Sequence, residues 1–95
     1  MSKAPTPREA AEIRLQYPPD TRIELELMVD AYAVSPGTRG TVDHVDDMGS
    51  VHIKWDNGRT LAAIPGVDSF RKLTAQELKE EQQGMAAPKM KEQSL

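Results

Sequence analysis

Residues 51–64 read VHIKWDNGRTLAAI, and this stretch decides the fold. Apolar and polar residues alternate over residues 51–55, which is the pattern of a strand that buries one face. Asn57 and Gly58 follow, and this dipeptide is the strongest short signal for a turn between two antiparallel strands. The alternation also favours a core position for Trp55, the only tryptophan, over an exposed aromatic platform that it would form with Tyr32. The stretch therefore predicts a β-hairpin.

The same alternation appears on both sides of this hairpin. Residues 23–27 read IELEL, which predicts a strand with one apolar and one charged face. In the next expected strand, Val42 and Val45 cannot both face inward with regular pairing, so we expect a β-bulge or a strong bend there. The five expected strands cover residues 23–27, 40–45, 51–55, 60–64 and 70–72.

Five short antiparallel strands must hide their edges and bury one face, and coiling into a small closed barrel achieves both. We therefore expect a mainly β protein built on a five-stranded SH3-like barrel. The competing architecture is a five-stranded oligonucleotide-binding barrel, which usually has a helix between its third and fourth strands. A barrel of this size fills its interior with its own side chains, so any binding site must lie on its surface or at a subunit interface.

Helix-start signals flank the barrel on both sides. Residues 6–9, TPRE, combine an N-cap threonine, a proline at the first helical position and a glutamate that completes a capping box. Residues 74–77, TAQE, form a second capping box, and Gly84 is the expected C-cap of the helix that follows. The expected segments are a flexible N-terminus (1–6), a short helix (7–17), the barrel (21–73), a second short helix (74–84) and a disordered tail (85–95).

The composition narrows the classes of function. The 95 residues carry a net charge of −3, which argues against a basic nucleic-acid-binding protein, and no cysteine, which excludes disulfides and Cys-ligated zinc. No apolar run approaches the roughly 20 residues of a membrane span, so we expect a cytoplasmic protein with no membrane association. No nucleophile has a partner base at a recognisable spacing, and no glycine-rich phosphate loop precedes a helix. We therefore expect neither an enzyme nor a cofactor.

A longer pattern of short motifs runs through the barrel segment. Its pieces are YPP at 17–19, PGT at 36–38, GTV at 40–42, VDD at 45–47, WDNG at 55–58 and PGVD at 65–68. The combination resembles a small bacterial family known only as a domain of unknown function, whose members occur in bacterial genomes, phages and conjugative plasmids. The resemblance covers residues 8–73 and implies a compact SH3-like barrel. It implies no catalytic residue, cofactor or substrate, and it suggests a role in host takeover, counter-defence or replication.

We interpret the chain as a non-catalytic interaction module that binds a protein partner through its barrel loops. Three loops are expected to converge at one edge, where Tyr32 offers an aromatic contact and Met48 an adaptable apolar one. The simpler interpretation of the aspartates in these loops is that they are turn residues bonded to nearby backbone amides. The expected partner surface consists of Asp30, Tyr32, Pro36, Asp46, Asp47, Met48 and Asp68.

The alternative function is that of a small nucleic-acid-binding barrel. Its phosphate-contacting strip would consist of His52, Lys54, Arg59 and Arg71. His44 and His52 can face each other across neighbouring strands, but two histidines fall short of the three or four ligands of a tight zinc site, so we expect no metal. We expect a monomer or a weak homodimer, because a small barrel without disulfides gains stability from self-association.

Overall fold

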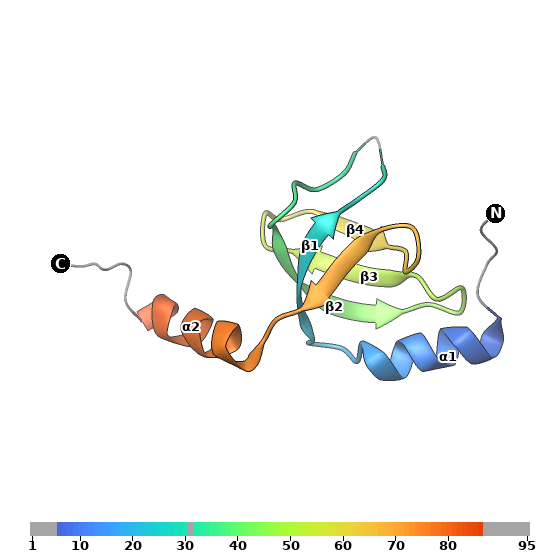
Figure 1. The fold of residues 1–95 in the computed structure, drawn as a ribbon, viewed down its shortest axis with the longest axis horizontal. Helices are drawn as coiled ribbons and strands as arrows, with labels where there is room; N and C mark the ends of the chain where they lie inside the picture. Colours follow the sequence, from blue (N-terminus) through green and yellow to red (C-terminus); the bar gives the residue numbers. More distant parts are fainter. Residues whose placement is uncertain (1–5, 31, 87–95) are drawn as a thin grey trace.

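The computed structural model describes residues 6–30 and 32–86 and confirms the predicted hairpin (Figure 1). β3 and β4 pair antiparallel, with Val51 opposite Ala63. In the turn between them the Trp55 amide donates to the Arg59 carbonyl over 2.8 Å, and Gly58 adopts the positive φ of 92° that such a turn requires. The strands are β1 (Arg22–Leu27), β2 (Arg39–Val45), β3 (Val51–Trp55), β4 (Thr60–Ala63) and β5 (Ser69–Lys72).

The five strands form one antiparallel sheet in the order β4-β3-β2-β1-β5, so the mainly β prediction is confirmed. The prediction of a closed barrel is wrong, because β4 and β5 end the strand order and do not pair with each other in the described part of the chain. Each of these edge strands has only four residues and few backbone groups to offer. Only a short turn joins β3 to β4, which leaves no room for the helix of the competing architecture.

A β-bulge interrupts the pairing of β2 with β3, as the positions of Val42 and Val45 predict. Val42 lies opposite Ile53, but the next pair is His44 with His52, so the register shifts between Val42 and His44. The shift lets both valines face the core, at 1% and 6% exposure. It also leaves two consecutive residues, Asp43 and His44, exposed on the outer face.

The core lies on the inner face of the bent sheet, and Trp55 belongs to it, as predicted. Its side chain is 3% exposed, and its indole Nε1 donates to the Leu61 carbonyl over 3.0 Å, so the one polar atom of the ring is satisfied. The core residues are Ile23, Leu25, Met28, Val34, Val42, Val45, Val51, Ile53, Trp55 and Ala63.

The N-terminal helix, α1 (Pro7–Gln16), forms as predicted. Thr6 and Glu9 make the capping box, with the Glu9 amide 3.1 Å from the Thr6 hydroxyl and the Thr6 amide 2.8 Å from the Glu9 carboxylate. Ile13 and the C-cap residue Tyr17 pack against the core, where the Tyr17 ring lies 5.3 Å from that of Phe70. Of the expected flexible N-terminus, residues 1–5 lie outside the described residues.

The C-terminal helix, α2 (Ala75–Ala86), extends two residues beyond its predicted end. Gly84 lies inside the helix, because a glycine costs only about 1 kcal/mol there and good helix formers follow it. Of the expected tail, residues 87–95 lie outside the described residues. Neither helix in the described chain is long and apolar enough to cross a membrane.

Candidate functional site

The long β1–β2 loop carries three residues of the predicted partner surface. The Asp30 carboxylate accepts from the Tyr32 amide over 2.7 Å, an Asx turn that leaves the Tyr32 side chain 75% exposed. Pro36 is exposed in the same loop. Arg59, from the β3–β4 turn, donates to the Tyr32 and Ala33 carbonyls, so a cation ties the loop to the neighbouring hairpin.

The β2–β3 turn carries Asp46, Asp47 and Met48 at the opposite end of β2 from the long loop (Figure 1). Arg14 of α1 donates to the Asp46 carbonyl and pairs with the Asp47 carboxylate at 3.2 Å, so this turn faces the N-terminal helix. β2 has seven residues, and at about 3.3 Å per residue the two loops are separated by its full length. The structure therefore does not bring the seven predicted residues together.

Asp68, the last predicted residue, joins the end of β1 to the β4–β5 loop. Its Oδ1 accepts from the Val29 amide over 2.9 Å, and its Oδ2 accepts from the Ile64 amide over 2.8 Å. One carboxylate therefore holds two chain segments 35 residues apart in the sequence side by side. Both of its oxygens are engaged, which makes Asp68 a structural clamp.

Exposed apolar side chains surround this clamp, and we call them the apolar rim. Val29 is 66% exposed, Leu27 58%, Val67 43% and Ile64 42%. The alternation of residues 23–27 predicted an inward Leu27, but the register between β1 and β5 shifts after Leu25 and turns Leu27 outward. The sequence signal for Val67 was its place in a turn motif, which says nothing about exposure.

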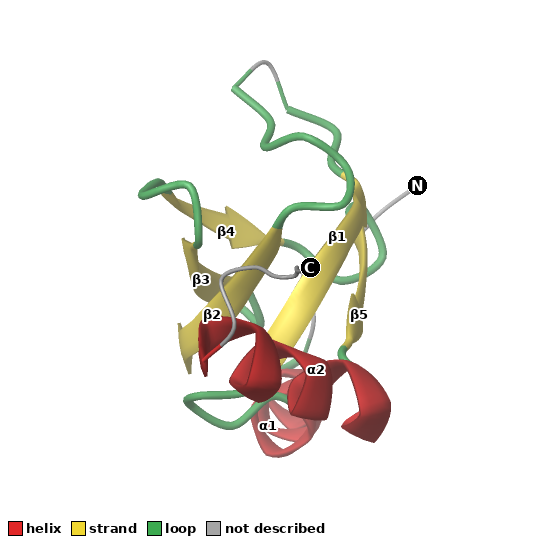
Figure 2. Cartoon of the chain, turned by 90° about the vertical axis from the view of Figure 1, so that its left-hand side faces the viewer, coloured by secondary structure: helices red, strands yellow, loops and turns green. Residues whose placement is uncertain are grey.

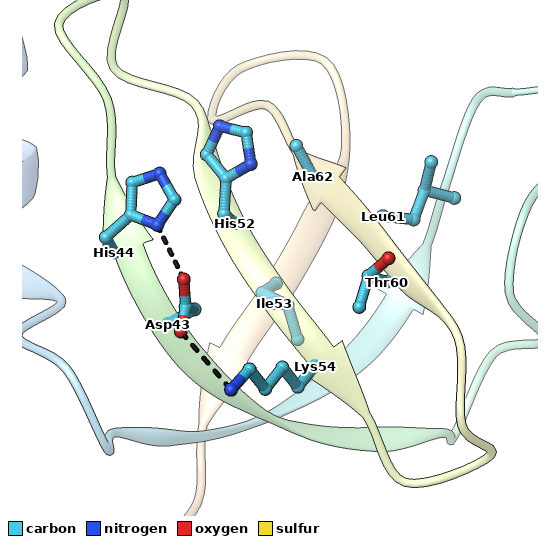
Figure 3. Close-up of a pocket in the computed structure, with 8 residues that line it drawn as sticks. All are labelled: Asp43, His44, His52, Ile53, Lys54, Thr60, Leu61 and Ala62. Carbon is cyan, nitrogen blue, oxygen red and sulfur yellow. Dashed lines mark hydrogen bonds and ion pairs between the residues drawn. The ribbon is translucent and has the colours of Figure 1, made fainter.

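The four residues of the predicted nucleic-acid strip do not lie together either. His52 and Lys54 both lie on the outer face of β3. They line a pocket of about 300 Å³ formed by residues of β2, β3 and β4 (Figure 3). Arg59 points instead to the long loop, and Arg71 lies on β5, three strands away in the sheet order. Arg71 also pairs with Glu24 at 3.3 Å and with Glu77 at 2.8 Å, so its charge is already balanced.

His44 and His52 do face each other, with rings stacked at a centroid distance of 4.3 Å and an interplanar angle of 7°. His44 Nδ1 lies 2.7 Å from Asp43, and His52 Nε2 lies 2.8 Å from Asp46. The hydrogen bond from each histidine lowers the pKa of its aspartate.

Stacked imidazoles hold their nitrogen lone pairs in parallel planes, so the two rings do not converge on one ion. Within the described residues, no group of three or more potential ligand side chains is placed to hold a metal.

Three arginines form a cluster on the outer face of the sheet that the sequence pattern does not predict. Arg22 on β1, Arg39 on β2 and Arg71 on β5 all pair with glutamates of α2, and we call these three residues the arginine face. Figure 2 shows α2 in front of the lower ends of β1 and β2. Glu24 and Asp56, from the sheet and the β3–β4 turn, pair with the same arginines. The sequence could show the basic residues and the i, i+4 spacing of Glu77 and Glu81, but not the strand order that brings them together.

Comparison with known proteins supports the resemblance noted in the sequence. Residues 6–73 match the family described as "Domain of unknown function (DUF4314)", a span that includes α1 and all five strands and ends before α2. No curated protein and no solved structure matches the chain. Because the match covers more than half of its length, the chain belongs to the DUF4314 family.

Proposed function

We propose that this protein is a non-catalytic interaction module that binds a protein partner through the apolar rim and the adjoining Tyr32 loop. The observation that carries the proposal is the Asp68 clamp, which holds Val29 and Ile64 side by side with their side chains exposed. Exposed apolar residues that are clustered and held rigidly are typical of a protein-binding surface. The Asp68 carboxylate accepts from two backbone amides, so its role is to hold the apolar rim in shape.

The charge around the rim indicates the chemistry of the partner. Glu26 and Asp30 are exposed beside Leu27 and Val29, and residues 21–73 carry a net charge of −2. An apolar segment flanked by lysine or arginine complements this surface, with the apolar side chains providing affinity and the charges steering approach.

The experiment compares two matched variants of the full chain. Val29→Asp places a charge in the rim, whereas Met48→Asp places the same charge on an equally exposed apolar residue at the other end of β2. A partner captured from bacterial lysate, then purified and measured by calorimetry, should lose at least about tenfold in affinity to Val29→Asp only. Equal losses for both variants, or none for Val29→Asp, contradict the proposal. Light scattering that shows a rim-dependent dimer assigns the surface to a second copy and also contradicts it.

A second candidate function is the binding of single-stranded nucleic acid at the pocket beside β3. The observation that favours it is the stacked His44–His52 pair next to Lys54, which together offer a flat aromatic surface and a cation. A gel-shift series that begins at about 50 mM salt tests it, since the few cations predict weak and salt-sensitive binding. If the wild-type protein shifts no oligonucleotide at that salt concentration, this candidate function is excluded.

We also propose that the chain is encoded by a phage or another bacterial mobile element, and that its partner is a host protein. The resemblance to a family found on such elements supports this proposal. The genes that flank its coding sequence test it, because integrase, portal or conjugation genes are expected among them.

A further inference from the structure

Over residues 75–83, the part of helix α2 whose side chains the structure describes, charged side chains make the contacts with the sheet. Among the side chains of residues 75–83, only Glu77 and Glu81 are half-buried, and the others are exposed. Leu78, the one large apolar residue of that stretch, is 39% exposed. Apolar burial by residues 75–83 therefore contributes little to the docking of this helix, in contrast to α1, whose Ile13 packs against the core.

Both glutamates bind the arginine face, largely in two-point contacts. Glu77 accepts from both Arg71 Nη atoms at 2.8 Å, and Glu81 accepts from Arg22 Nε at 3.0 Å and Nη2 at 2.6 Å. Arg39 lies between them, 3.4 Å from Glu77 and 3.2 Å from Glu81. The face is thus complementary to a helix that presents two carboxylates four residues apart on one side.

The ion pairs between α2 and the arginine face are partly open to solvent. The glutamates are 20% and 24% exposed and the arginines 21% to 36%, so solvent and salt reach every pair. Salt weakens ion pairs this accessible, although their two-point geometry and shared arginines make them stronger than isolated surface pairs, which contribute about 0–1 kcal/mol each. The docking of α2 by these two glutamates should therefore weaken as the salt concentration rises, and undocking would uncover the arginine face.

The contact between the arginines and the glutamates joins residues that match the family to residues that follow the match. All three arginines lie within residues 6–73, which match the family, and both glutamates lie beyond it. The arginine face therefore lies within the residues that match the family, and the helix that occupies it follows those residues.

We propose that the arginine face is a docking site for an acidic helix of another protein, and that α2 occupies this site in cis as a displaceable inhibitor. An acidic helix fits better than nucleic acid, because residues 21–73 carry a net charge of −2 and repel a polyanion, whereas two fixed carboxylates match the arginines locally. The face lies at the start of β1, and the apolar rim lies at the end of the same strand. The proposal is therefore independent of the protein-binding function assigned to the rim.

The test uses the full-length protein and a synthetic peptide with the sequence of residues 74–86. The variant Glu77→Gln/Glu81→Gln removes the two carboxylates of α2 that contact the arginine face, while glutamine at position 77 can still complete the capping box with Thr74. An NMR titration of isotope-labelled protein detects weak peptide binding and reports which residues shift. We expect the variant to bind the peptide at least about tenfold more tightly than the wild type, whose face is occupied at high effective concentration.

Three controls make the result specific. The peptide with glutamine at both glutamate positions should bind at least about tenfold more weakly, and about 0.5 M salt should abolish binding of the acidic peptide. Adding Arg39→Gln to the double variant should remove binding, while Trp55 fluorescence shows that the core is intact. The proposal is overturned if the folded double variant binds the acidic peptide no better than the wild type. It is also overturned if the variant prefers a single-stranded oligonucleotide to the peptide.

Discussion

Gly40 lies against Ile53 so closely that a Cβ atom at position 40 would be 2.6 Å from Ile53 Cγ2. The same atom would be 3.0 Å from the Trp55 ring and from the Lys54 carbonyl. β2 and β3 can approach this closely only because residue 40 has no side chain.

Gly40→Ala should therefore destabilise the protein by about 1–3 kcal/mol, the usual range for an overpacked core. Urea unfolding followed by Trp55 fluorescence measures the change. Gly66→Ala is the matched control, because the space around Gly66 is open and only its positive φ of 89° opposes a side chain. The control should lose about 1 kcal/mol and Gly40→Ala should lose more, so equal losses for the two variants would contradict a steric role for Gly40.

Asp68→Asn tests the clamp beneath the apolar rim. Asparagine offers one acceptor oxygen where two amides need acceptors, so either the Val29 or the Ile64 amide loses its partner. We expect a loss of about 1–2 kcal/mol in stability and faster amide hydrogen exchange at positions 29 and 64. Asp47→Asn, whose carboxylate is fully exposed, should change neither quantity. Unchanged exchange in Asp68→Asn would show that the rim does not depend on the clamp.

The pKa of Glu77 predicts how α2 docking depends on pH. The hydrogen bond from Arg71 and that from the Thr74 amide lower the pKa of Glu77 from 4.5 to about 2. A carboxyl group whose pKa is lower in the folded state contributes stability that is complete above its unfolded pKa and is lost as the pH falls. The stability difference between wild type and Glu77→Gln should thus be constant above about pH 5, shrink below pH 4.5 and vanish near pH 2. Urea unfolding from pH 7 to pH 3 measures it, and a difference that does not shrink below pH 4.5 would contradict this assignment.

The sequence predicts local features well, because each depends on neighbouring residues. The alternation of residues 51–55 gives β3 with its bounds, and the spacing of Val42 and Val45 gives the bulge. Closure of the barrel depends instead on how strands distant in the sequence twist and end, and no local pattern predicts it. The inward Leu27 fails for the same reason, because a shift against β5 reverses its orientation.

In the candidate sites, too, contacts between neighbouring strands are predicted by the sequence and contacts between distant segments are not. The alternation in β2 and β3 indicates that His44 and His52 face each other, because a short hairpin fixes that register. Arg22 and Glu81, in contrast, are 59 positions apart, and their contact depends on the place of β1 in the sheet and on the angle of α2. Three loops expected at one edge are likewise distributed over both ends of β2.

The last prediction concerns His52 and Asp46, whose side chains are 2.8 Å apart. The pKa of Asp46 lies below its usual value, first because of the hydrogen bond from His52 and then because of those from the Ser50 and Met48 amides. His52→Ala removes the largest of these contributions, so the pKa of Asp46 should rise, although the two amides still donate to its carboxylate. NMR titration of the carboxyl carbon measures this pKa directly. His44→Ala is the control, because His44 lowers the pKa of Asp43 instead and should leave Asp46 unchanged. If His44→Ala raises the pKa of Asp46 as much as His52→Ala does, the stacked rings act as one unit rather than as two separate pairs.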